Sequence, residues 1–228
     1  MEITVQYLIT LFLFLSFSVC AELHTPNLSA KYEIRDQLGF QVNRSELIFS
    51  IFEGHVVREV PEQNIIEHWV QRKDGRHVFY RHFPSHRKSL YYNRGDLRAL
   101  SLASSWEQVS EVIPSVWLQS LNLKELKDSE FGEVEVYQGT IGEFEVEIDW
   151  LKSQSIPYRY SIRKQYQRLT LQLTEFDSSS NISQKLSEWD SYQSIDFSDA
   201  MDMERDTFVQ YLMSSGQLNT NGLGLHQH

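Results

Sequence analysis

Four short runs of alternating apolar and polar residues between positions 132 and 176 constrain the fold more than any other feature. In the run 143–150 every second side chain is apolar and the others are acidic; the apolar ones are Phe144, Val146, Ile148 and Trp150. A period of two puts one face of a strand in a core and the other in water. Similar runs occupy 132–138, 156–163 and 169–174. Four such runs at short spacing predict an antiparallel meander.

A second group of strands is predicted upstream, over residues 47–102. Its β-branched and aromatic runs lie at 56–57, 65–70, 77–83 and 90–92. Asp74-Gly75 stands between two of these runs, and this dipeptide favours a hairpin turn. Residues 22–45 carry few strong signals, and we expect them to form a peripheral strand or helix.

The period changes between the two strand groups, over residues 104–121. Ser104 or Ser105 can begin a helix, with Glu107 or Gln108 completing a capping box. Apolar residues then follow at helical spacing until Pro114 breaks or restarts the helix. The sequence therefore predicts an α+β fold, in which a helical insertion separates two parts of an antiparallel sheet.

The chain changes character again at Asp177. We divide it into a β domain at 22–176 and an acidic C-terminal extension with short helices at 177–228. The acidic residues near the end of this extension are Asp196, Asp199, Asp202, Glu204 and Asp206. They suggest either a calcium site or carboxylates that cap a helix start.

The N-terminus resembles an export signal. Residues 3–21 carry no charge, and their apolar core is shorter than the roughly 20 residues that span a bilayer. Val19 and Ala21 suit cleavage after Ala21, which predicts a periplasmic protein with a signal peptide at 1–21. The alternatives are a retained membrane anchor and a lipoprotein modified at Cys20.

The composition excludes several kinds of chemistry. The only cysteine, Cys20, lies in the predicted leader, so we expect no disulfide and no cysteine-based zinc site. No nucleophile motif is present, and we expect no enzymatic activity and no cofactor. His77, His82 and His86 are close in sequence, but Phe83-Pro84 breaks the helical spacing that a metal site would use, so we expect surface histidines. A formal net charge of −10 argues against nucleic-acid binding.

Positive charge is nevertheless concentrated in residues 72–98, which contain eight Lys and Arg residues and two acidic residues. We expect a docking surface for an anionic partner that includes Arg76, Arg81 and Arg87. The alternative is a solvated sheet face, one that pairs internally with the acidic strand face at 133–149.

The downstream strands carry a weak family pattern. It comprises Val134-Glu135-Val136-Tyr137-Gln138-Gly139, Val146-Glu147-Ile148-Asp149-Trp150-Leu151, Ile156-Pro157-Tyr158-Arg159 and Leu169-Thr170-Leu171-Gln172-Leu173-Thr174-Glu175-Phe176. This order, within residues 47–176, resembles the half-open β-barrel of periplasmic lipoprotein carriers and of related envelope-stress sensors. The tail after Asp177 is not part of that pattern and looks like uncharacterised exported proteobacterial proteins.

The resemblance implies a curved sheet around an apolar cavity that is partly closed by helices and that holds acyl chains. The inward-facing candidates are Trp69, Phe79, Tyr91, Trp150, Tyr160 and Leu171, although these side chains could equally pack the core. The function implied is a non-enzymatic carrier of lipid or lipoprotein acyl chains, with peripheral membrane contact. The alternative function is a sensor, chaperone or assembly factor that binds an envelope protein through its sheet and basic segment.

Overall fold

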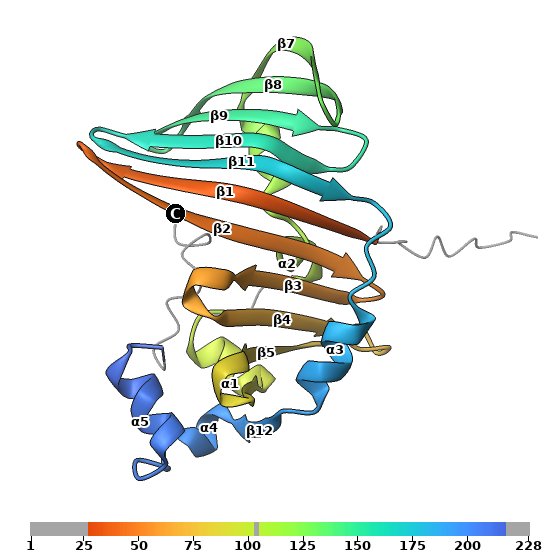
Figure 1. Ribbon diagram of the computed structural model, residues 1–228. Helices are drawn as coiled ribbons and strands as arrows, with labels where there is room; N and C mark the ends of the chain where they lie inside the picture. Colours follow the sequence, from red (N-terminus) through yellow and green to blue (C-terminus); the bar gives the residue numbers. More distant parts are fainter. Residues whose placement is uncertain (1–26, 103–104, 218–228) are drawn as a thin grey trace, which may run out of the picture.

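A single open sheet of 12 strands organises the chain (Figure 1). The computed structural model describes residues 27–102 and 105–217. In spatial order the strands are β12, β6, β5, β4, β3, β2, β1, β11, β10, β9, β8 and β7. All neighbours are antiparallel except β12 and β6. The predicted α+β fold with an antiparallel sheet is therefore confirmed, whereas the predicted signal peptide lies outside the described residues.

The bounds of β8 to β11 follow the four alternating runs. The strands are β1 (Leu28–Leu38), β2 (Gln41–Phe52), β3 (His55–Val60), β4 (Ile65–Gln71), β5 (His77–Phe83), β6 (Lys88–Tyr92), β7 (Asn122–Ser129), β8 (Gly132–Ile141), β9 (Phe144–Leu151), β10 (Ile156–Lys164), β11 (Gln167–Asp177) and β12 (Gln193–Asp196). The predicted meander is β8 to β11. The predicted Asp74-Gly75 turn joins β4 to β5, where Gly75 has a φ of +77° and donates its N–H to the Arg72 carbonyl at 2.9 Å.

The described part of the segment 22–45, residues 27–45, does not form the peripheral element that we expected. Strand β1 lies at the centre of the sheet and pairs with β2 on one side and β11 on the other. Tyr32 at its middle is fully buried, and its hydroxyl donates to the Pro157 carbonyl at 3.0 Å. Pairing of β1 with β11 joins the two strand groups into one sheet, a long-range contact for which the local sequence has no signal.

The segment between the strand groups forms short helices. They are α1 (Arg94–Ala99), α2 (Trp106–Val109) and the 3-10 helix η3 (Ser115–Ser120). Two further 3-10 turns lie within the first strand group: η1 (Pro61–Gln63) between β3 and β4, and η2 (Pro84–His86) between β5 and β6. Ser105 and Gln108 form the predicted capping box of α2. Asn93 and Asp96 form a second capping box, at α1. Pro114 is the N-cap of η3 and prevents one continuous helix through this segment.

The two faces of the sheet are covered differently. The inner face is the one covered by α1, α2, η3 and α5 (Thr207–Ser214), whose apolar side chains join the main core. The outer face is covered only over β3 to β5, by α3 (Ser183–Asp190), which appears in front of the sheet in Figure 1. Leu186 and Trp189 of α3 pack there against Val57 and Ile66.

The C-terminal region extends the sheet and closes its lower end. Strand β12 pairs in parallel with β6, and α4 (Phe197–Ala200) follows it. The Asp206 carboxylate accepts hydrogen bonds from the backbone N–H groups of Phe208 and Val209 at 2.8 and 3.1 Å. Of the two explanations for the acidic residues, helix capping is therefore confirmed for Asp206. Among the described residues, no helix has the length and apolar character needed to cross a membrane.

Candidate functional site

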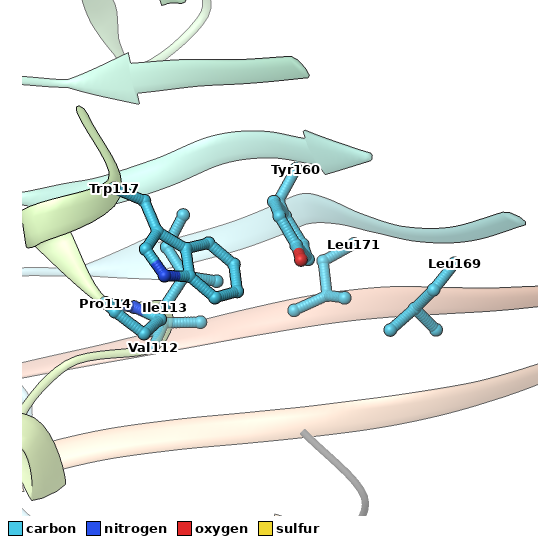
Figure 2. A pocket seen from close by; sticks show the side chains of 7 residues that line it. All are labelled: Val112, Ile113, Pro114, Trp117, Tyr160, Leu169 and Leu171. Atoms are coloured by element: carbon cyan, nitrogen blue, oxygen red, sulfur yellow. The ribbon is translucent and has the colours of Figure 1, made fainter. Parts of the chain in front are cut away.

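An apolar crevice lies where η3 meets the sheet (Figure 2). Its lining residues are Val112, Ile113, Pro114, Trp117, Tyr160, Leu169 and Leu171. The space inside is about 10 Å³, room for no more than a single water molecule. Drug-sized ligands occupy pockets of about 300–1,000 Å³. The crevice is thus almost filled by its own side chains.

Strand alternation and a proline together build this crevice. Tyr160 on β10 lies directly opposite Leu171 on β11, so both side chains point to the inner face. Pro114 begins the turn that lays Trp117 across them, with the Trp117 and Tyr160 rings 6.0 Å apart. Burial among these apolar groups raises the pKa of the Tyr160 hydroxyl, which therefore stays neutral.

The other predicted cavity residues do not line the crevice. Trp69 and Phe79 stack on each other with ring centroids 4.4 Å apart, and the Phe79 ring lies 5.1 Å from that of Tyr92. Trp150 is buried on the inner face of β9 with 6% of its surface exposed. These three side chains belong to the closed core, the second of the two roles that the sequence left open.

Tyr91 does not point inward as predicted. It lies opposite Tyr80 across β5 and β6, and the two rings are 5.3 Å apart on the outer face. Tyr92 takes the inward position, fully buried, and burial raises the pKa of its hydroxyl to about 12. The error has a simple cause: both faces of β6 are largely covered, so its sequence lacks the alternation that would reveal the facing of each residue.

Arg58 fastens the covering segment (residues 93–102 and 105–121) to the sheet. Its side chain, 2% exposed, points inward from β3 and donates from Nη2 to the carbonyls of Val109 and Glu111 at 2.7 and 3.0 Å. Desolvation lowers its pKa to about 10, which still leaves the guanidinium charged. One arginine thus supplies two buried hydrogen bonds between sheet and cover.

A buried charge row continues from Arg58 across the inner face. Glu67 on β4 lies opposite Arg58 on one side and Arg81 on the other. Arg81 donates from Nη2 to the Glu67 carboxylate at 3.2 Å, and only 3% of its surface is exposed. Arg81 is therefore a core residue and cannot be part of the predicted docking surface.

The remaining arginines of that prediction are exposed but lie in different settings. Arg76 pairs with Asp74 at the tip of the β4–β5 hairpin. Arg87 lies beyond the other end of β5, with its guanidinium over the Tyr192 ring. The three arginines do not share one exposed surface.

The acidic face of β9 does not pair with the basic segment either. Its carboxylates pair with β10 and β7: Glu145 with Arg163, Glu147 with Arg159 at 2.9 Å, and Asp149 with Lys127 at 2.7 Å. Glu143, just before β9, pairs with Lys164 at the end of β10. The ion pairs connect neighbouring strands, so the alternative of pairing with residues 72–98 is also wrong.

A hydrogen-bonded histidine chain crosses the outer face beneath α3. His55 Nδ1 lies 2.8 Å from His68 Nε2, and His68 Nδ1 lies 3.0 Å from His82 Nε2. His82 Nδ1 lies 2.7 Å from the Ser89 hydroxyl. Trp189 of α3 stacks on His82 with ring centroids 5.4 Å apart. The chain connects four successive strands, β3 to β6.

Burial keeps these imidazoles neutral. Desolvation, with repulsion from the neighbouring rings, lowers the pKa of His68 to about 2, and desolvation lowers that of His82 to about 4. Desolvation also lowers the pKa of His55, although Asp190 and Glu53 act against it. Neutral imidazole offers one donor and one acceptor, so three neutral rings in a row can satisfy one another.

The three histidines singled out in the sequence do not meet. His77 contacts Trp69 and Trp106, His82 is in the buried chain, and His86 packs on Tyr211. His82 is only 3% exposed, so the expectation of three surface histidines is wrong for it. Within residues 27–102 and 105–217, no group of three or more His, Cys, Asp or Glu side chains is arranged to hold a metal ion.

Two parts of the site were missed by the sequence analysis. Arg58 had only a weak signal: it lies among Val56, Val57 and Val60, next to a second charged residue, Glu59. His55 and His68 meet because of the cross-strand register of β3 and β4. The only sequence signals for that register are the turn residues. The crevice residues Val112, Ile113 and Trp117 were expected only as part of an apolar helical surface.

Comparison with known proteins finds similarity only to solved structures. No protein-family profile and no curated protein matches the chain. One similar solved structure is an uncharacterised conserved protein from Thermus thermophilus, with a TM-score of 0.38 and 12% identity over 76% of this chain and 91% of that one. A LolA superfamily protein from Nitrosomonas europaea has a TM-score of 0.33 and 7% identity over 71% and 90% of the two chains. The Pseudomonas aeruginosa MucA/MucB complex gives 0.37 and 11%, over 74% and 58%. All three TM-scores are below 0.5, and the identities are 12% or less.

Proposed function

We propose that this chain is a non-enzymatic binding module that holds an acyl chain between the covering segment and the inner face of the sheet. The observation that carries the proposal is the apolar crevice at that boundary, where free space remains between cover and sheet. Apart from the Tyr160 hydroxyl, its lining side chains are apolar. An apolar crevice without a cluster of ionisable groups suits an aliphatic ligand better than a reaction.

Binding requires the covering segment to move, because the crevice holds only about 10 Å³. The cover is suited to this movement. Its helices are single turns or little more, and Arg58 supplies its buried hydrogen bonds to the sheet. Short helices of this kind depend on tertiary packing for their stability, so an acyl chain can replace the cover's contacts at moderate cost.

Extraction of the purified protein with organic solvent, followed by mass spectrometry, tests the proposal. The protein should be produced with its own N-terminus and exported, and we expect lipid at close to one molecule per chain. A fluorescent fatty acid should also bind and be displaced by unlabelled fatty acid. Failure of both experiments would show that the inner face is only a core.

A matched pair of variants places the ligand. Leu169 is half-buried at the crevice, whereas Leu126 on β7 is 57% exposed. Leu169→Trp should fill the crevice and abolish probe binding, while Leu126→Trp should bind as the wild type does. Full binding by Leu169→Trp would move the ligand away from this crevice.

Edge strand β7 favours a second function, the binding of an extended segment of a protein partner. Its outer edge has no neighbouring strand among the described residues, and Leu123 and Leu126 are more than half exposed. An open edge of this kind accepts an added strand. Lys124→Pro, also on β7, would remove a backbone donor, and unchanged capture of a partner by this variant would exclude strand addition there.

We further propose that the chain is exported and acts in the periplasm. The uncharged segment 3–21 and the Val19–Ala21 cleavage pattern support this. Intact-mass measurement of the exported protein should give a chain that begins at Glu22. A mass that includes residues 1–21 would indicate an anchor, and a lipid adduct on Cys20 would indicate a lipoprotein.

A further inference from the structure

Apolar side chains are exposed together at the tips of two hairpins, β1–β2 and β10–β11. Their exposed fractions are 55% for Leu38, 107% for Phe40, 49% for Val42 and 82% for Tyr166. These four residues are called the tip patch below. Single exposed apolar residues are common, but grouped ones that include two aromatic rings indicate a contact surface.

The structure holds the two tips side by side. Gly39 donates its backbone N–H to the Tyr166 carbonyl at 2.9 Å, and Leu38 lies opposite Gln167 in the β1–β11 ladder. Both turns contain a residue in the left-handed region, Gly39 at φ +59° and Gln165 at φ +51°. Figure 1 shows the two tips next to each other at one edge of the sheet. The tip patch is therefore a fixed, protruding feature and not two separate loops.

Positive charge surrounds the tip patch. Residues 35–44 and 163–168 contain five Lys and Arg side chains and one acidic side chain, in a chain whose formal net charge is −10. Some of this charge is already paired: Arg163 with Glu145, Lys164 with Glu143, and Arg35 with Glu33. All three pairs are solvent-exposed, and such pairs exchange partners at little cost.

We infer that the tip patch inserts into the headgroup region of an anionic lipid bilayer. A bilayer fits this surface because the tips protrude and expose aromatic rings among cationic side chains. Aromatic rings with flanking cations are typical of the membrane interface, where rings rest at headgroup depth and cations meet lipid phosphates. This contact is separate from the crevice and does not depend on acyl-chain binding there.

Vesicle flotation tests the inference with phosphatidylcholine vesicles that contain or lack phosphatidylglycerol. We expect binding to the anionic vesicles that weakens with salt, since exposed charges are screened beyond about 8 Å at physiological ionic strength. Phe40→Ser with Tyr166→Ser should reduce binding at least roughly tenfold, because both rings lose their membrane contact. The control is Leu123→Ser with Leu126→Ser, which removes two exposed apolar groups from β7 and should bind normally.

A tryptophan reporter shows which part of the protein enters the lipid. In Phe40→Trp the emission should shift to shorter wavelength with anionic vesicles and be quenched by lipids brominated in the acyl chain; in Leu126→Trp it should not. Absence of wild-type vesicle binding, or equal binding by the tip variant, would overturn the inference. So would a wild-type dimer that Phe40→Ser with Tyr166→Ser converts to monomer, because the tip patch would then bind a second copy. Leu169→Trp should still bind vesicles, which separates this inference from the proposed carrier function.

Discussion

The outer face of the sheet has two halves with opposite chemistry. Over β9 and β10 it is open to water, and its charged side chains form ion pairs such as Glu147 with Arg159, each about one-third exposed. Over β3 to β5 it is covered by α3, and its polar side chains form a chain of neutral histidines. Both halves use cross-strand polar contacts. On this face, the covered half therefore carries neutral polar contacts and the open half carries charged ones.

The physical reason is the cost of removing charge from water. Exposed ion pairs lose little hydration and contribute little, commonly 0–1 kcal/mol or thereabouts. Under α3 the same charges would lose their hydration, and buried ions cost several kcal/mol even when paired. Imidazole avoids this cost because it can lose its charge near neutral pH and still hydrogen-bond on both sides.

The largest expected effect tests whether the inner face of β9 is buried while its outer face is open to water. Trp150→Asp places a carboxylate on the inner face of β9, where Trp150 is 6% exposed, and should unfold the protein. An unpaired buried charge costs several kcal/mol, comparable with the whole stability of about 5–15 kcal/mol. Glu147→Lys on the outer face of the same strand should change stability by no more than about 0.5 kcal/mol. Equal thermal melts for the two variants would show that the faces of β9 are assigned wrongly.

The next largest effect concerns the packing of α3 on the outer face. Trp189→Ala removes the ring that stacks on His82 and packs on Val57, and should cost about 3–5 kcal/mol in urea unfolding. On the open half, Arg159→Ala should cost less than about 1 kcal/mol, because it removes only an exposed ion pair. Similar losses of stability for the two variants would mean that α3 does not exclude water from the histidine chain.

The pH dependence of stability sharpens the comparison. The pKa values of His68 and His82 are lowered from 6.5 to about 2 and about 4 in the folded state. Below pH 6.5 the unfolded chain therefore binds protons that the folded chain does not, so stability is complete above that pH and is lost as pH falls. At about pH 5 the titration of each of these two histidines should have lowered the free energy of unfolding by about 2 kcal/mol.

Urea unfolding between about pH 7.5 and pH 5 measures this loss. His68→Asn with His82→Asn should flatten the curve, because the titrating groups are gone. His86→Asn, at an exposed histidine, should leave the wild-type slope unchanged. A wild-type protein equally stable at both ends of this range would contradict a buried neutral chain.

The smallest effect concerns Asp149, a buried acidic side chain on the open half of the outer face. Asp149 is 1% exposed and pairs with Lys127, and its Oδ1 has no hydrogen-bond partner among the described residues. Lys127→Ala should cost about 2 kcal/mol, because it leaves a buried carboxylate unpaired. Adding Asp149→Asn should restore much of this loss. Lys152→Ala, which breaks a pair whose lysine is 75% exposed, is the control and should have little effect.

Much of the sheet could be predicted from the sequence because strand signals are local. The alternation of Val146, Ile148 and Trp150 gave β9 and its buried face, and Asp74-Gly75 gave a hairpin. Polar strands gave no such signal. Edge strand β7 was missed because most of its residues are exposed, and β1 was misplaced because its second half is polar and solvent-exposed on both faces.

The candidate site was harder to predict because it depends on what covers each face. Alternation cannot tell Tyr91 from Tyr92 when α3 and its neighbours cover one face of β6 and the core covers the other. A cationic run of strand residues looks like a surface until Glu67 is found opposite Arg81. The volume left beneath the covering segment depends on how closely η3 approaches β10 and β11, a distance that no sequence period encodes.

By itself the sequence determined local conformations: the alternating strands, the Asp74-Gly75 turn and the capping box of α2. These depend on contacts between residues a few positions apart, so residue type is enough to specify them. Tertiary structure alone decided that β1 pairs with β11 and that α3 dries one half of the outer face. It also decided that Arg58 and Arg81 lie inside. Each of these results depends on segments far apart in the chain, because burial and the resulting cost of charge belong to the assembled structure.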